Sequence, residues 1–257
     1  MPTRTEPWPP GAPCWVDIGV PDVAAAREFY GRVFGWSFAG GDDPQFGGYL
    51  TCEAGGGQAA GMGPQQDPSD RPRWTTYFAT ADADATAAAV TGNGGSVVAG
   101  PFDVGPMGRM AIAVDPQGVP FGLWQAGMHL GTTVPGEHGA PVWTEAHLPD
   151  TEAGRDFYGA VFGWSFTPLP DETDYQMFGP GGPEGWGGIA RTGDMPGADS
   201  PRWLTYFAVD DTDAAVTAVQ AGEGAVLAPA TDTPYGRLAV LADPWGAEFA
   251  VMVPAPM

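Results

Sequence analysis

Hydrophobic and polar residues alternate in short runs along the chain, and the first run, at 15–20, is typical of a β-strand. Pro21 and Asp22 follow this run. Asp22 is a good helix N-cap, because its carboxylate can accept a hydrogen bond from the backbone of the first turn. Apolar residues then recur three or four positions apart up to Phe34, and Gly35 comes next. This spacing predicts a helix over 23–34 with one apolar face, which Gly35 ends.

Short strands are predicted after this helix, and the pattern then starts again. The first β-type runs are 36–38, 49–53 and 58–62. A second leading strand is predicted at 74–80, and Asp82 or Asp84 caps a short alanine-rich helix that ends near residue 90. The closing strands are predicted at 96–99, 109–114 and 121–124. One helix backing several strands, twice in succession, favours an α+β fold class.

The second half of the chain repeats the first. Residues 11–38 and 139–166 are identical at 17 of 28 positions. PRWTTYFATAD at 72–82 matches PRWLTYFAVDD at 201–211, and GRMAIAVDP at 108–116 matches GRLAVLADP at 236–244. The offset is 128 or 129 throughout, which predicts two domains, 1–128 and 129–257, joined by a linker near 129–138. Four βαβββ modules are therefore expected, two in each domain.

Charge and composition exclude several classes of function. The net charge is −21, and all ten basic residues are arginine. Such a field repels nucleic acid and anionic membranes, so neither is expected as a partner, although acidity also serves solubility. The absence of lysine excludes Schiff-base catalysis and a P-loop. Cys14 and Cys52 have no counterparts in the second half, which indicates reduced thiols and a cytoplasmic protein.

The modules resemble those of the glyoxalase/bleomycin-resistance, or vicinal oxygen chelate, family. The resemblance rests on a strand followed by Pro-Asp, a helix that carries Phe-Tyr and ends in Phe-Gly-Trp, and the turns Asp115-Pro116-Gln117-Gly118 and Asp243-Pro244-Trp245-Gly246. It implies paired βαβββ modules whose curved sheets enclose a cleft. Because one chain supplies both modules of each cleft, a monomer is sufficient, and a homodimer is also compatible.

The resemblance also defines where a metal would bind. Metal-dependent members place one ligand on the first strand, seven residues before the helix-capping Asp, and another seven residues after the Asp of Asp-Pro-x-Gly. In this chain these positions and their counterparts are Trp15, Thr75, Gly122, Trp143, Leu204 and Ala250. None is a usual metal ligand. Glu145 and His147 share a strand face and would need two further donors, so neither a metal nor another cofactor is expected.

Aromatic residues and carboxylates are expected to line the clefts instead. Trp15 and Asp17 share a strand face, as do Trp143 and Glu145. The other candidate ligand-binding residues are Tyr77, Trp124, His147 and Tyr206. An aromatic surface beside an anion suits a flat cationic or polar aromatic small molecule. The alternative is that the tryptophans fill the core and that His147 is a structural, hydrogen-bonded histidine.

Arg109 and Arg237 each follow a glycine at the start of a strand. They could bind the carboxylate or phosphate of a ligand. The interpretation that we favour is structural, an ion pair with Asp17 or Glu145 across the cleft.

Two functions agree best with these features. The first is a metal-free small-molecule binding protein that sequesters a drug or natural product, as the resemblance to bleomycin-resistance proteins implies. The second is a metal-independent isomerase, cyclase or lyase in which Asp17 and Glu145 are catalytic general bases, since a carboxylate in an apolar cleft can have a raised pKa. A metal-dependent lyase or dioxygenase with unusual ligands, and a stress-associated scaffold without a ligand, are further alternatives.

Overall fold

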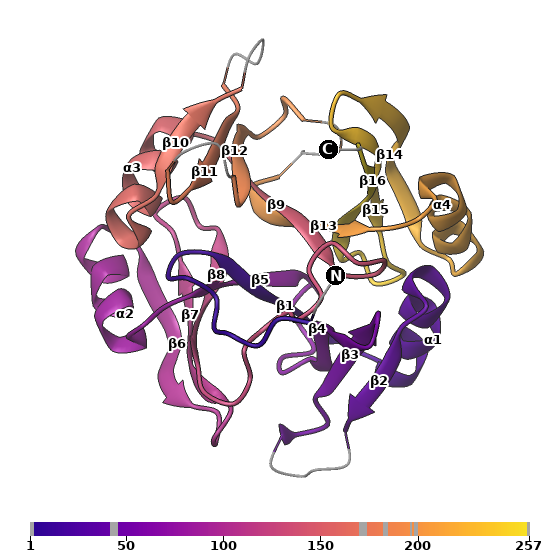
Figure 1. The fold of residues 1–257 in the computed structure, drawn as a ribbon, viewed down its shortest axis with the longest axis horizontal. Helices are drawn as coiled ribbons and strands as arrows, with labels where there is room; N and C mark the ends of the chain where they lie inside the picture. The colour runs from indigo at the N-terminus through magenta and orange to yellow at the C-terminus, as the bar shows by residue number, and fades with distance from the viewer. Residues whose placement is uncertain are drawn as a thin grey trace.

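Two eight-stranded sheets of identical topology make up the computed structural model, which describes residues 3–41, 46–169, 174–181, 185–195, 197 and 200–255. The first sheet has the order β2-β3-β4-β1-β5-β8-β7-β6, and the second has the order β10-β11-β12-β9-β13-β16-β15-β14. The predicted α+β class with two domains of paired βαβββ modules is confirmed (Figure 1).

The first half contains two modules. Its elements are β1 (Pro13–Val20), α1 (Val23–Phe34), β2 (Ser37–Gly40), β3 (Leu50–Ala54), β4 (Gly57–Pro64), β5 (Trp74–Ala79), α2 (Ala83–Gly92), β6 (Ser96–Asp103), β7 (Gly108–Val114) and β8 (Pro120–Ala126). The first helix has the bounds that the apolar spacing predicts. Asp22 Oδ1 accepts a hydrogen bond from the Ala25 amide at 3.0 Å, and Gly35 ends the helix in the left-handed region at φ 67°.

The second half repeats this series. Its elements are β9 (Pro141–Leu148), α3 (Thr151–Phe162), β10 (Ser165–Pro168), β11 (Gln176–Gly179), β12 (Gly187–Arg191), β13 (Arg202–Ala208), α4 (Thr212–Ala221), β14 (Ala225–Thr233), β15 (Gly236–Ala242) and β16 (Glu248–Pro254). Asp150 and Asp211 cap α3 and α4 in the same manner as Asp22 caps α1. None of the helices among the described residues has the length and apolar character needed to cross a membrane.

The leading strands hold the centre of each sheet. β1 pairs in parallel with β4 and antiparallel with β5, so that Asp17 lies opposite Gly61 on one side and Thr75 on the other. Alternate residues point to opposite faces. Val16 and Ile18 face the helices and join the core, whereas Trp15 and Asp17 lie on the face away from the helices, which we call the inner face.

The hydrophobic cores are shared between the halves. One core combines apolar residues of the first module with those of the fourth, including Phe34, Phe207 and Phe249. A second core combines the second module with the third, including Phe78 and Phe178. In Figure 1, α1 accordingly lies beside α4 and α2 beside α3. Modules pair edge to edge within a half and pack through their helical faces across the halves.

Two buried tyrosine–aspartate hydrogen bonds connect the halves. Tyr30 of α1 donates to Asp243 Oδ2 at 2.9 Å, and Tyr158 of α3 donates to Asp115 Oδ2 at 3.0 Å. The other oxygen of each aspartate accepts two backbone amides of its own Asp-Pro-x-Gly turn, for example those of Trp245 and Ala247 on Asp243. The Phe-Tyr helix and the Asp-Pro-x-Gly turn, recognised separately in the sequence, are therefore two ends of one contact.

The Phe-Gly-Trp motif makes a second reciprocal contact. Trp36 Nε1 donates to the Gly139 carbonyl at 2.7 Å, and Trp164 Nε1 donates to the Gly11 carbonyl at 2.9 Å. Gly11 has φ +84°, and a Cβ added there would lie 2.9 Å from Trp164 Nε1. Glycine is therefore required at this position both by its backbone conformation and by the indole that approaches it.

We expect Tyr158→Phe and Tyr30→Phe each to lower the free energy of unfolding by about 1–3 kcal/mol, because each removes a donor from a buried carboxylate. Tyr235→Phe is the control, since Tyr235 is half exposed. Urea unfolding monitored by tryptophan fluorescence would measure the change. Equal stability of all three variants would contradict a role for these bonds in holding the halves together.

Candidate functional site

The inner face of the first sheet carries a carboxylate held by two tyrosines. Tyr77 of β5 donates to Asp17 Oδ2 at 3.1 Å, and Tyr49 donates to the same oxygen at 3.2 Å. Trp15 Nε1 in turn donates to the Tyr49 hydroxyl at 2.9 Å. The predicted grouping of Trp15, Asp17 and Tyr77 is therefore present, with Tyr49 connecting the tryptophan to the carboxylate.

The second sheet repeats this arrangement around Glu145. Tyr175 donates to Oε1 at 2.7 Å, and Tyr206 donates to Oε2 at 2.6 Å. Trp143 Nε1 donates to Tyr175 at 2.9 Å. His147 Nε2 lies 3.2 Å from Oε2, and its ring is fully buried. His147 is thus the hydrogen-bonded structural histidine that was one of the two expectations.

Tyr49 and Tyr175 were not among the residues singled out in the sequence. The segment between Phe166 and Tyr175 is two residues shorter than that between Phe38 and Tyr49, so a fixed offset does not align them. A further signal lies in β4 and β12, where a Cβ added at Gly61 or Gly188 would lie 1.8 or 2.0 Å from the tyrosine hydroxyl oxygen. These glycines leave the space that each tyrosine needs to reach its carboxylate.

The two carboxylates differ in their accessibility. Asp17 and Thr75 are each partly exposed, and the neighbouring Met110 and Ile112 are also only partly buried. Among the described residues nothing donates to Asp17 Oδ1. The first inner face is therefore open to solvent beside a carboxylate oxygen that can still accept a hydrogen bond.

The corresponding part of the second sheet is closed. Glu145 is 4% exposed, Leu204 replaces Thr75 and is fully buried, and Val240 replaces Ile112 and is 1% exposed. The backbone at Gly197 lies against Val240, with a Cβ there only 3.1 Å from Val240 Cγ1. Both oxygens of Glu145 already accept hydrogen bonds.

The pKa values of the two carboxyls are shifted in opposite directions. Burial raises the pKa of Asp17 to about 7, and the hydrogen bonds from Tyr77 and Tyr49 oppose this shift only in part. Burial also disfavours the ionised form of Glu145, but hydrogen bonds from His147, Tyr206 and Tyr175 outweigh it and lower its pKa. Asp17 can therefore exchange a proton near neutrality, whereas Glu145 is held as an anion.

Trp15 and Trp143 do not line two separate clefts, one in each half, as the sequence predicts. Trp15 and Trp143 line one common cavity of about 190 Å³ between the halves, together with Trp8 and Trp186. Neither carboxylate lines this cavity. Trp124 is 6% exposed, and its Nε1 donates to the carbonyl of His129, a linker residue that packs edge-on against it and against Trp15.

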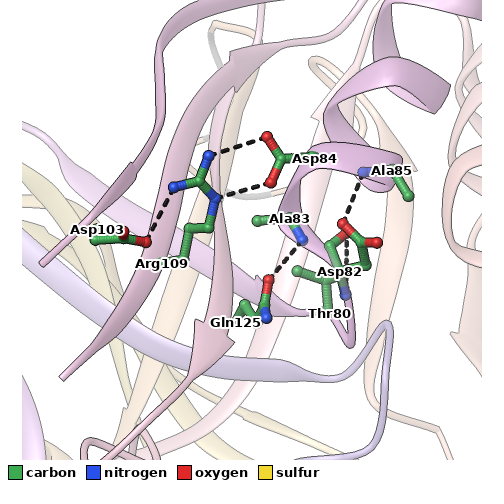
Figure 2. Close-up of polar contacts among 8 residues, drawn as sticks. All are labelled: Thr80, Asp82, Ala83, Asp84, Ala85, Asp103, Arg109 and Gln125. Atoms are coloured by element: carbon green, nitrogen blue, oxygen red, sulfur yellow. Dashed lines mark hydrogen bonds and ion pairs between the residues drawn. The ribbon is translucent and has the colours of Figure 1, made fainter. Parts of the chain in front are cut away.

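The expectation that Arg109 and Arg237 pair with Asp17 and Glu145 was wrong. Arg109 is bidentate to Asp84 and also contacts Asp103 at 2.9 Å, as Figure 2 shows. Arg237 makes the equivalent contacts with Asp213 and Asp232. The reason is that successive residues of a strand point to opposite faces of the sheet. Met110 faces inward on β7, so Arg109 points to the helical side and meets the first turn of α2. These guanidiniums are therefore not part of either inner face.

The sequence matches the family model of the Glyoxalase/Bleomycin resistance protein/Dioxygenase superfamily twice, at residues 14–123 and 142–251. The chain belongs to this superfamily. A putative glyoxylase, CFP32, of Mycobacterium bovis is 38% identical over 263 aligned positions, which cover 100% of this chain and 99% of the relative. The anthracycline biosynthesis protein DnrV of Streptomyces peucetius is 40% identical, with 95% of this chain and 93% of the relative covered.

Solved structures share the fold at lower sequence identity. The Mn(II)-bound glyoxalase from Novosphingobium aromaticivorans has a TM-score of 0.64 at 18% identity, covering 96% of this chain and 89% of its own. The 2,3-dioxygenase LapB from Pseudomonas sp. KL28 also has a TM-score of 0.64, at 15% identity, covering 96% and 94%. At this level of identity the likeness concerns the fold alone.

The glyoxalase with the same fold holds Mn(II), which raises the question whether the residues here fit a metal. Within the described ranges no three His, Cys, Asp or Glu side chains come together. Glu145 and His147 lie together, but both Glu145 oxygens accept tyrosine hydroxyls and His147 Nε2 is hydrogen-bonded to Glu145. A divalent ion needs several free N or O donors that converge. The donor set of either sheet does not fit one.

The raised pKa of Asp17 predicts a pH dependence of stability. Between about pH 4 and pH 7 the folded state keeps a proton that the unfolded state releases, so the free energy of unfolding should fall as the pH rises through this window. Asp17→Asn should remove this contribution, so its free energy of unfolding should fall less steeply across the window than that of the unmodified protein, whereas Glu145→Gln should keep it. Urea titrations at several pH values would measure it, and identical profiles for Asp17→Asn and the unmodified protein would contradict the assignment.

Proposed function

We propose that this protein binds a small aromatic molecule on the inner face of the first half, with Asp17 as the polar anchor. One observation carries the proposal: Asp17 is partly exposed and no described residue donates a hydrogen bond to its Oδ1, whereas its counterpart Glu145 is buried and both of its oxygens accept hydrogen bonds. A carboxylate exposed to ligand on one side and fixed by tyrosines on the other is preorganised for recognition.

The surroundings of Asp17 favour a flat ligand with a positive charge or a hydrogen-bond donor. Met110 and Ile112 supply an apolar surface on the same face, and methionine adapts readily to aromatic rings. The two tyrosines donate to Oδ2 and leave Oδ1 as an acceptor. The similarity to a protein of anthracycline biosynthesis supports a planar, oxygen-rich aromatic of this kind. No step of this binding requires a metal.

The second half has a supporting role in this proposal. Leu204 and Val240 fill the positions where the first half is open, and Glu145 is engaged on both oxygens. A ligand would have to displace buried apolar side chains to reach it. In this proposal the first half holds the ligand site, and the equivalent tryptophan, tyrosines and carboxylate of the second half stabilise its sheet without binding a ligand.

A second candidate function is proton transfer on the bound molecule. A pKa of about 7 suits Asp17 to act as a general base near neutrality, because a catalytic group is most effective when its pKa is close to the working pH. Asp17 would then remove a proton from carbon or oxygen of the ligand through Oδ1, and Tyr49 and Tyr77 would stabilise the ionised carboxylate. Isomerisation or ring closure of a carbonyl compound is the reaction class that this chemistry serves.

The site can be tested with a fluorescent anthracycline that carries an amino sugar as the probe. We expect Thr75→Leu, which introduces the residue of the closed second half, to weaken binding by at least about tenfold, or roughly 1.4 kcal/mol. Thr75→Val keeps the size of the side chain and is the matched control. Fluorescence titration measures both, and equal affinity of the two variants would place the ligand elsewhere.

The pH dependence of the same titration tests the role of Asp17. A cationic probe should bind more tightly as the pH rises through about 7, because Asp17 then carries its negative charge. Asp17→Asn should remove this dependence. For the enzymatic candidate, the same variant would lose turnover by orders of magnitude while affinity changes little, so the two functions are separated by measuring both quantities.

A further inference from the structure

A second cavity between the halves, of about 150 Å³, is surrounded by arginines. The repeated Pro-Arg-Trp segments, 72–74 and 201–203, face each other across it. Arg71, Arg73 and Arg202 line it, and among the described residues that line it Glu248 is the one acidic residue. We call this cavity the arginine pocket. It shares no lining residue with the tryptophan cavity and contains none of the inner-face residues around Asp17.

The charge of this pocket is opposite to that of the rest of the molecule. Three of the ten basic residues of the chain meet here, and the described part of the lining holds one carboxylate, although the net charge of the protein is −21. The acidic surface disfavours the approach of anions from a distance, but charges more than about 8–10 Å away are screened at physiological ionic strength. Local guanidinium groups therefore decide what the pocket attracts.

The repeat leaves this pocket asymmetric. Arg202 Nε lies 3.0 Å from Glu248 Oε2 in the second half, and Arg71 reaches over to the Gly246 carbonyl at 3.1 Å and to Glu248 at 3.6 Å. The position that corresponds to Glu248 in the first half is Pro120, which also lines the pocket. Arg73, the counterpart of Arg202, consequently forms no ion pair with any described residue.

We propose that the arginine pocket binds a small oxyanion, a phosphate or carboxylate group, between the two halves. A guanidinium presents a planar fork of donors that matches either anion, and Arg73 supplies one that no carboxylate among the described residues neutralises. The cavity, of about 150 Å³, has room for a single phosphate or small carboxylate group beside these side chains. This site is independent of the one proposed at Asp17.

Binding of two probes to the intact protein tests this proposal. Inorganic phosphate and malonate would each be titrated by calorimetry at constant ionic strength. We expect saturable binding of at least one probe. Phosphate alone would indicate a phosphate group as the natural ligand, and malonate alone a carboxylate. Absence of saturable binding of both would overturn the proposal.

Variants locate the anion. Arg73→Gln removes the guanidinium that no described carboxylate neutralises, and Pro120→Glu introduces into the first half the carboxylate that neutralises Arg202 in the second. Each should weaken binding at least about tenfold. Arg32→Gln is the control, because Arg32 is an exposed residue paired with Glu28 outside the pocket. Unchanged affinity in Arg73→Gln, whose exposed position should not affect folding, would overturn the proposal even if Pro120→Glu fails to fold.

Discussion

The pair of buried hydrogen bonds from Tyr30 to Asp243 and from Tyr158 to Asp115 is the contact on which the rest of the structure depends. Each aspartate is fixed by two backbone amides of its turn and receives a tyrosine from the other half of the chain. A buried carboxylate with fewer donors would be costly, so these bonds require the two halves to pack in one relative position. The shared hydrophobic cores then form around them.

This arrangement explains why modules of one half differ from each other while the halves resemble each other. The first and third modules supply the Phe-Tyr helices, and the second and fourth supply the Asp-Pro-x-Gly turns that receive them. Each half is therefore incomplete on its helical side. The two inner-face carboxylates, Asp17 and Glu145, lie outside the two shared cores, so their surroundings can diverge without loss of the common fold.

The divergence is greatest around the two carboxylates. Both halves keep a tryptophan, two tyrosines and an acid in one hydrogen-bonded group, but burial raises the pKa of Asp17 while donors lower that of Glu145. When the environments of paired groups separate their pKa values in this way, different roles follow for the two. A partly exposed Asp17 suits ligand recognition or proton exchange, and an enclosed Glu145 suits the stability of the second sheet.

Much of this protein could be predicted from residue spacing. The helix at Val23–Phe34, the duplication, the order of strands and the common strand face of Trp15 and Asp17 all follow from periodicity and local capping, which act over a few residues. The tertiary structure decided the partners. Arg109 lies on the strand face that points to α2, and it therefore pairs with Asp84. Tyr49 and Tyr175 occupy equivalent positions in the two halves, but the preceding loops differ in length, so the sequence repeat does not align them. Burial alone distinguished the open carboxylate from the closed one, because burial depends on side chains that meet only after the chain has folded.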